Sequence, residues 1–186
     1  IDAYADIYRF PWLKFRVNAP TNGSDYFVQV TYRPTRGTEI YTRFRSESKP
    51  INYNPNELTL SPVIGQPRQN WRTQVNVKIN SRFSVRNRVE LVWYDKNGGA
   101  AERGFLMFAD FFYKPQLKPL SANMRLLFFE TDGYNSRLYA FENDVLYSFS
   151  IPVIYDKGFR YYLNLNYDFG KRISVWARWA QTVFRD

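Results

Sequence analysis

The sequence predicts an all-β protein, an antiparallel transmembrane β-barrel of about ten strands, and three observations support this prediction. Apolar and polar residues alternate in one segment after another, while helical periodicity is nearly absent. Most alternating segments run for roughly 8 to 14 residues, whereas strands in soluble sheets favour about 5–6 and a tilted membrane strand needs about 9–11. Aromatic residues make up 19% of the chain, and Tyr and Trp favour membrane interfaces.

The expected strands follow one another without a linker or a shift in composition, so residues 1–186 are expected to form a single domain. The strands are expected at residues 5–18, 26–33, 39–48, 70–79, 83–94, 104–113, 122–131, 138–151, 160–169 and 173–184. Pro11 and Pro152 fall inside expected strands, which indicates a bulge or an early end there. Residues 49–68 are rich in Asn and Pro and are expected to form a long surface loop.

Two hairpins have a register that follows from their pattern, because apolar residues must face apolar residues across the pair. The stretch WRTQVNVKIN, residues 71–80, alternates without interruption. A three-residue turn after Ile79 places Arg72 opposite Glu90, which predicts a cross-strand ion pair. A turn at 170–172 predicts the further pairs Phe169–Ile173, Leu163–Trp179 and Asn164–Arg178.

The alternation divides each strand into two faces with different expected surroundings. In a membrane barrel, apolar side chains face lipid and polar side chains face the lumen. The side chains expected to face lipid are Trp71, Val75, Val77, Ile79, Leu163, Leu165 and Trp179. Those expected to face the lumen are Arg72, Lys78, Arg86, Arg88, Glu90, Asp110, Arg125 and Arg178. Most of this second set is basic, so the sequence predicts a basic polar lumen.

Two features do not fit a simple barrel. Residues 104–113 are apolar on both faces apart from Asp110, and 122–131 is nearly so; contact with an inner loop or another chain would account for this. The two short turns also fall on opposite sides of the membrane if every segment crosses it, whereas barrels usually gather short turns on one side. Either the strand count between 122 and 155 is off by one, or one short turn is extracellular.

A family resemblance covers roughly residues 70–184. The stretches ERGFLMFADFFYKP (102–115), SRLYAFENDVLYSFSIP (136–152) and GFRYYLNLNYDFGKRISVWARWAQTVF (158–184) resemble the C-terminal region of large outer-membrane barrels in Bacteroidota. Members of that family carry N-terminal helix-hairpin-helix repeats of the competence DNA-binding type, which are absent from this sequence. The resemblance implies that at least one more strand follows and that these strands belong to a larger barrel. It brings no catalytic residues.

Composition excludes several kinds of chemistry. The chain has no His and no Cys, which removes Ser-His-Asp triads, imidazole and thiolate metal sites and cysteine nucleophiles. It also lacks the Gly-rich phosphate-binding motifs. Asp110, in an apolar run, is expected to be neutralised by an arginine. The carboxylates Glu130, Asp132, Glu142 and Asp144 cluster near a loop but lack the spacing of a known Ca²⁺ loop. We therefore expect neither an enzyme nor a bound cofactor or metal.

The expected function is a non-catalytic, porin-like barrel of the bacterial outer membrane with a structural, transport or assembly role. The net charge of +9 favours anionic partners, here membrane lipids and lipopolysaccharide, with other outer-membrane or periplasmic proteins as further partners. A basic lumen would favour anions, and an internal salt-bridge network would instead plug it. One alternative is a DNA-uptake or surface-binding component, with DNA as a partner by family analogy only. Another is a soluble β-sandwich that binds carbohydrate.

Overall fold

The computed structural model describes residues 1–15, 17–53, 61–95, 101–170 and 172–185. These residues form one large antiparallel sheet, a separate two-stranded piece and a single turn of 3-10 helix, η1 (Tyr134–Ser136). The chain is therefore all-β, as predicted. The strands of the large sheet are β1 (Asp2–Phe10), β2 (Thr21–Thr35), β3 (Thr38–Asn52), β4 (Val63–Lys78), β5 (Phe83–Asp95), β6 (Ala101–Tyr113), β7 (Leu120–Thr131), β10 (Lys157–Phe169) and β11 (Ile173–Phe184).

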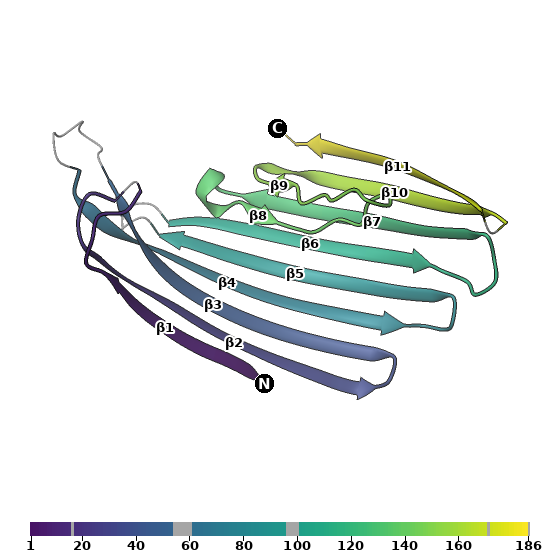
Figure 1. The fold of residues 1–186 in the computed structure, drawn as a ribbon, viewed down its shortest axis with the longest axis horizontal. Coiled ribbons are helices and arrows are strands. Elements are labelled where there is room, and N and C mark those ends of the chain that lie inside the picture. Colours follow the sequence, from purple (N-terminus) through teal and green to yellow (C-terminus); the bar gives the residue numbers. More distant parts are fainter. Residues whose placement is uncertain (16, 54–60, 96–100, 171, 186) are drawn as a thin grey trace.

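The nine strands are arranged as a meander in which neighbours in the sequence are neighbours in the sheet, in the order β1-β2-β3-β4-β5-β6-β7-β10-β11. The sheet is open, with β1 and β11 at its two edges (Figure 1). Because the strands alternate in direction, the connections β2–β3, β4–β5, β6–β7 and β10–β11 lie at one end of the sheet (Figure 1).

The structure corrects one expected boundary, that of the loop at 49–68, and confirms another, the strand end at Pro11. β3 continues to Asn52 and β4 begins at Val63, and the two pair along their whole length, so the expected loop at 49–68 is much shorter. Pro50, Asn52 and Pro67 lie on paired strands, because a proline is tolerated wherever the ladder does not need its N–H. β1 ends at Phe10, directly before Pro11, which confirms the early end that the proline indicated.

The first predicted hairpin is confirmed. Arg72 lies opposite Glu90 in the register of β4 and β5. The side chain of Asn80 closes the turn, because its Oδ1 accepts the backbone N–H groups of Arg82 and Phe83 at 2.8 and 2.9 Å. An Asn side chain that replaces backbone hydrogen bonds in this way is a common cause of tight turns.

The second predicted hairpin, between β10 and β11, is also confirmed. Its pairs are Phe169–Ile173, Leu163–Trp179 and Asn164–Arg178. Gly170 in the turn has φ of +67°, a left-handed conformation that glycine adopts without steric cost. With both registers fixed, the parity of each residue decides on which face of the sheet it lies.

The predicted strand at 138–151 is wrong. β7 pairs directly with β10, starting at Glu130 opposite Lys157, and the chain between them leaves the sheet. In this stretch only β8 (Leu138–Tyr139) and β9 (Val153–Ile154) form strand pairs, and they pair with each other. The large sheet therefore has nine strands rather than ten. Removing one crossing also places both short predicted turns at the same end of the sheet, which resolves the conflict noted above.

Residues 132–156, here called the inner segment, fold back over β6, β7 and β10 (Figure 1). We call the face that they cover the inner face and the opposite one the outer face. The core lies between the segment and the sheet and consists of Val92, Leu106, Phe108, Leu127, Phe129, Leu138, Ala140 and Ile154. A Cβ on Gly104 would lie 2.3 Å from the Ser136 carbonyl oxygen, so only glycine permits this approach. Contact with an inner loop thus explains why β6 and β7 are apolar on both faces.

Candidate functional site on the inner face

The registers place the predicted site residues on two opposite faces of the sheet. All eight residues expected to face a lumen lie on the inner face: Arg72, Lys78, Arg86, Arg88, Glu90, Asp110, Arg125 and Arg178. Six of the seven expected to face lipid lie on the outer face: Trp71, Val75, Val77, Leu163, Leu165 and Trp179. Ile79 lies in the turn after β4 and is exposed. Within the first set Glu90, Asp110 and Arg125 are buried, whereas Lys78 is exposed near the short turns.

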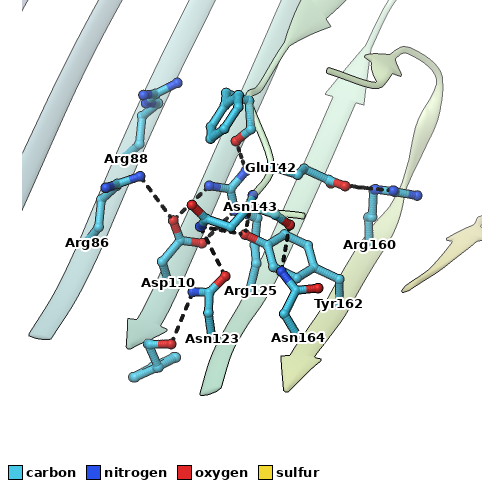
Figure 2. Close-up of polar contacts among 12 residues, drawn as sticks. Arg86, Arg88, Asp110, Asn123, Arg125, Glu142, Asn143, Arg160, Tyr162 and Asn164 are labelled. Atoms are coloured by element: carbon cyan, nitrogen blue, oxygen red, sulfur yellow. Dashed lines mark hydrogen bonds and ion pairs between the residues drawn. The ribbon is translucent and has the colours of Figure 1, made fainter. Parts of the chain in front are cut away.

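Arg125 of β7 and Asp110 of β6 form a fully buried ion pair on the inner face (Figure 2). Nε and Nη2 of Arg125 donate to the two carboxylate oxygens at 2.5 and 2.7 Å, a bidentate geometry. Its Nη1 donates to the Phe141 carbonyl oxygen at 2.7 Å, and its guanidinium lies 3.7 Å from the centroid of the Phe108 ring. Arg86 adds a second positive charge 3.7 Å from Asp110. Asp110 is thus neutralised by arginine, as expected.

Glu142 makes a second buried ion cluster, which ties the inner segment to the last two strands of the sheet. Its two carboxylate oxygens accept from Nε and Nη2 of Arg160 at 2.6 and 2.8 Å. Arg178 also donates to Glu142 and, through its other terminal nitrogen, to Asp144. A buried carboxylate is costly unless it is paired and hydrogen-bonded, and here two guanidinium groups meet that requirement.

The four carboxylates that the sequence brings together do not form a cation site. Glu142 and Asp144 bind arginines, and Glu130 pairs with Lys157 at 2.7 Å on the outer face. Asp132 accepts a backbone N–H at 2.9 Å. Within the described ranges no group of three or more acidic side chains is arranged to hold a metal ion.

Amide side chains complete the attachment of the inner segment (Figure 2). Asn143 Nδ2 donates to Asn123 Oδ1 at 3.0 Å and to the Tyr162 hydroxyl at 3.2 Å. Asn164 in turn donates to the Asn143 carbonyl oxygen at 2.6 Å. Two neighbouring strands, β7 and β10, therefore hold one residue of the segment through three side chains, which fixes its position over the sheet.

Beyond the inner segment the inner face is open over β3, β4 and part of β5. Arg72 binds Glu90 through Nε and Nη2, both at 2.7 Å, and Asn70 donates to the same carboxylate at 2.8 Å. The predicted Arg72–Glu90 pair is thus present. Arg88 donates to the Gln74 side-chain oxygen at 2.9 and 2.6 Å. A cavity of about 240 Å³ lies at this open part, beside β8.

Several residues of the inner face were missed by the reasoning from sequence. Arg43, Arg45 and Arg68 line the cavity, and Glu142 with Arg160 anchors the inner segment. The alternation of Arg43 and Arg45 in the stretch TRFRSE was a usable signal for the first two, because it places both on one face of β3. Glu142 carried no such signal, because its surroundings depend on a segment that leaves the sheet.

These side chains attach the inner segment to the sheet and leave positive charge on the inner face. Arginine engages the buried carboxylates Glu90, Asp110 and Glu142, and the cations in excess remain at the open part. No helix among the described residues is long and apolar enough to cross a membrane. No protein-family profile, curated protein or solved structure matches the chain significantly.

Proposed function

We propose that this chain forms the wall of an outer-membrane β-barrel and that the inner segment fills part of its lumen. The role is non-catalytic: a scaffold with a partly plugged, basic lumen. Its partners are membrane lipids and lipopolysaccharide on the outer face. The resemblance to Bacteroidota outer-membrane barrels agrees with this proposal.

The observation that carries the proposal is the distribution of polarity between the two faces. Buried ion pairs and amide contacts lie on the inner face, whereas the outer face exposes rows of apolar side chains such as Met107, Phe111, Leu163 and Leu165 (37–48% exposed). Nothing within the described ranges covers that outer face. In water such a surface would be unfavourable at about 25 cal/mol per Å², whereas in a bilayer lipid covers it.

The arrangement along β10 adds support. Its outer face carries Phe159 and Tyr161 at one end, leucines in the middle, and Tyr167 and Phe169 at the other end. Aromatic girdles flank the apolar band of membrane barrels in this manner. The alternative of a soluble sandwich needs a second sheet against these side chains, and the described residues form one large sheet.

The strand count sets a condition on closure. Nine antiparallel strands in a meander make β1 and β11 run in the same direction, so they cannot pair with each other as antiparallel neighbours. A closed antiparallel barrel that contains this sheet therefore needs an odd number of further strands, from a longer chain or from another copy. The even strand numbers of single-chain bacterial barrels agree with that condition.

The experiment that tests the proposal compares two outer-face substitutions in lipid. Leu163→Arg, in the middle of β10, is expected to destabilise the protein by about 2–4 kcal/mol in a bilayer, because an arginine there meets hydrocarbon. Ile173→Arg is the matched control at the strand end and is expected to cost about 0–1 kcal/mol. Urea unfolding in lipid vesicles measures both. Equal effects of the two variants, or a stable monomer in buffer without detergent, would contradict a membrane location.

The state of the lumen needs a separate measurement. Single-channel recording in planar bilayers compares the wild type with a variant in which a short Gly-rich turn replaces residues 132–156. Because the inner segment covers only part of the inner face, we expect small anion-preferring currents that increase when the segment is removed. Equal currents from the two proteins would show that the segment does not obstruct the lumen.

A further inference from the structure

The open part of the inner face has more positive than negative charge at short range. Four arginines and two glutamates line the 240 Å³ cavity between β3, β4 and β8. Glu90 forms an ion pair with Arg72. Glu47 lies 3.2 Å from Arg45 and 3.0 Å from Lys49. Two cations, Arg43 and Arg68, are left without a carboxylate partner among the described residues.

The surroundings of Arg43, whose side chain is half-buried, are unusual for a guanidinium. Its Nε is fully buried and has no hydrogen-bond partner, and its side chain makes no ion pair with any described residue. In the register it lies directly opposite Arg72, whose Nε and Nη2 are already bound to Glu90. Like charges in directly opposed cross-strand positions are destabilising, and an unpaired buried donor adds to this cost.

Arg68 faces the same cavity from β4. Its Nη2 donates to the Arg137 carbonyl oxygen at 2.7 Å, a neutral acceptor, while Glu47 lies opposite it in the register without forming an ion pair with it. This bond also holds the guanidinium against the inner segment, so its position is defined before any ligand arrives. Tyr139 supplies an additional hydroxyl group at the rim of the cavity, where the Arg137 Nε donates to it at 2.9 Å.

We propose that this cavity binds a compact oxyanion with two negative charges, of the phosphate or phosphate-ester class, between Arg43 and Arg68. The planar fork of arginine matches phosphate oxygens in a bidentate fashion. A volume of 240 Å³ holds such an anion, since a water molecule occupies about 30 Å³. The bound anion would accept hydrogen bonds from the terminal nitrogens of Arg43 and offset the repulsion between Arg43 and Arg72. The site goes beyond the proposed barrel function and does not depend on it.

The test is calorimetric titration of the full chain with inorganic phosphate at low ionic strength, with sodium acetate as the singly charged comparison. We expect one phosphate per chain and at least tenfold weaker binding of acetate. Glucose 6-phosphate forms a further arm, which distinguishes a free phosphate site from one that accepts a phosphate ester. The titration has the same meaning in detergent and in plain buffer, so its failure is separate from a failure of the membrane proposal.

Arg43→Gln is expected to weaken phosphate binding at least tenfold. Arg103→Gln is the matched control, because it removes the same charge from an exposed side chain outside the cavity, and its affinity is expected to stay within twofold of the wild type. Phosphate is also expected to raise the melting temperature of the wild type but not of Arg43→Gln. If Arg43→Gln does not reach the wild-type circular dichroism spectrum, Arg68→Gln takes its place. Equal affinity in the cavity and control variants, or no phosphate binding by the wild type at millimolar concentration, would overturn the proposal.

Discussion

The inner face consists of two parts that differ in how completely their charged side chains are paired. Where the inner segment covers it, over β6, β7 and β10, each buried carboxylate meets one or two arginines, and Asp110, Arg125 and Glu142 have no exposed surface. Where the face is open, over β3 and β4, the arginines outnumber the carboxylates, and the Arg45 side chain is 42% exposed. In the covered part the buried carboxylates are paired with arginines, whereas the open part retains positive charge that water or an anion can reach.

This difference shows what the inner segment does to the sheet. Low-dielectric surroundings make an unpaired charge expensive, so charges under the segment must match each other. Solvent relaxes that requirement over β3 and β4. A charge substitution should therefore be costly in the covered part and tolerated in the open part, and the predictions below test this in order of expected effect.

The largest effect is expected for Arg125→Ala. It leaves Asp110 buried, with only Arg86 at 3.7 Å as a nearby cation, and removes the hydrogen bond to the inner segment. Breaking one partner of a buried pair typically costs about 3–5 kcal/mol. Urea unfolding followed by tryptophan fluorescence measures the loss. The double variant Asp110→Leu/Arg125→Leu is the control and should recover much of the lost stability, because no unpaired charge remains. A loss below about 1 kcal/mol in the single variant would contradict the view that charges in the covered part must be paired.

Glu142→Gln is expected to be the next most damaging change. The neutral amide keeps an acceptor oxygen but leaves Arg160 without its charge partner, for a loss of about 2–3 kcal/mol. Since Glu142 anchors the inner segment, amide hydrogen exchange should increase in residues 138–154 more than in β4 and β5. Uniform acceleration over the whole sheet would show instead that the segment and the sheet open as one unit.

Arg72→Gln tests the open part at one of its bidentate ion pairs. Glu90 keeps the hydrogen bond from Asn70, so we expect a loss of about 1–2 kcal/mol. A double-mutant cycle with Glu90→Gln isolates the coupling between the two side chains. A loss as large as that of Arg125→Ala would remove the distinction between the two parts.

Arg33→Gln should have the smallest effect. Arg33 pairs with Glu39 at 2.6 Å, but its side chain is 70% exposed near the short turns. Solvent screens such a pair, and we expect a change of about 0.5 kcal/mol or less in the same unfolding experiment. A change above 1 kcal/mol would mean that this end of the sheet is shielded from water.

Much of the fold was predictable because alternation and turn chemistry are local. The Arg72–Glu90 and Leu163–Trp179 pairs followed from parity and a short turn, and both are present. The inner segment was not predictable in the same way. Leu138, Ala140 and Glu142 alternate like a strand because they too bury one side, and alternation reports a buried side without saying what covers it.

A usable signal for the segment existed in its neighbours. The inner face of β6 and β7 is apolar, with Leu106, Phe108, Leu127 and Phe129. An apolar surface of this kind is normally covered by another part of the protein or by a partner. The cavity at Arg43 could not be predicted from the sequence. Arg43 lies opposite Arg72 because β3 pairs with β4, whereas the sequence predicts a long loop at 49–68 between them.

The attachment of the inner segment also has a consequence for modularity. Its two ends lie side by side, since Thr131 N–H donates to the Asp156 carbonyl oxygen at 2.9 Å and Asp156 N–H donates to the Thr131 hydroxyl at 2.7 Å. A tight turn could therefore join β7 to β10 without altering a single rung of the ladder between them. An insertion at this position can therefore be lengthened, shortened or replaced while the scaffold persists.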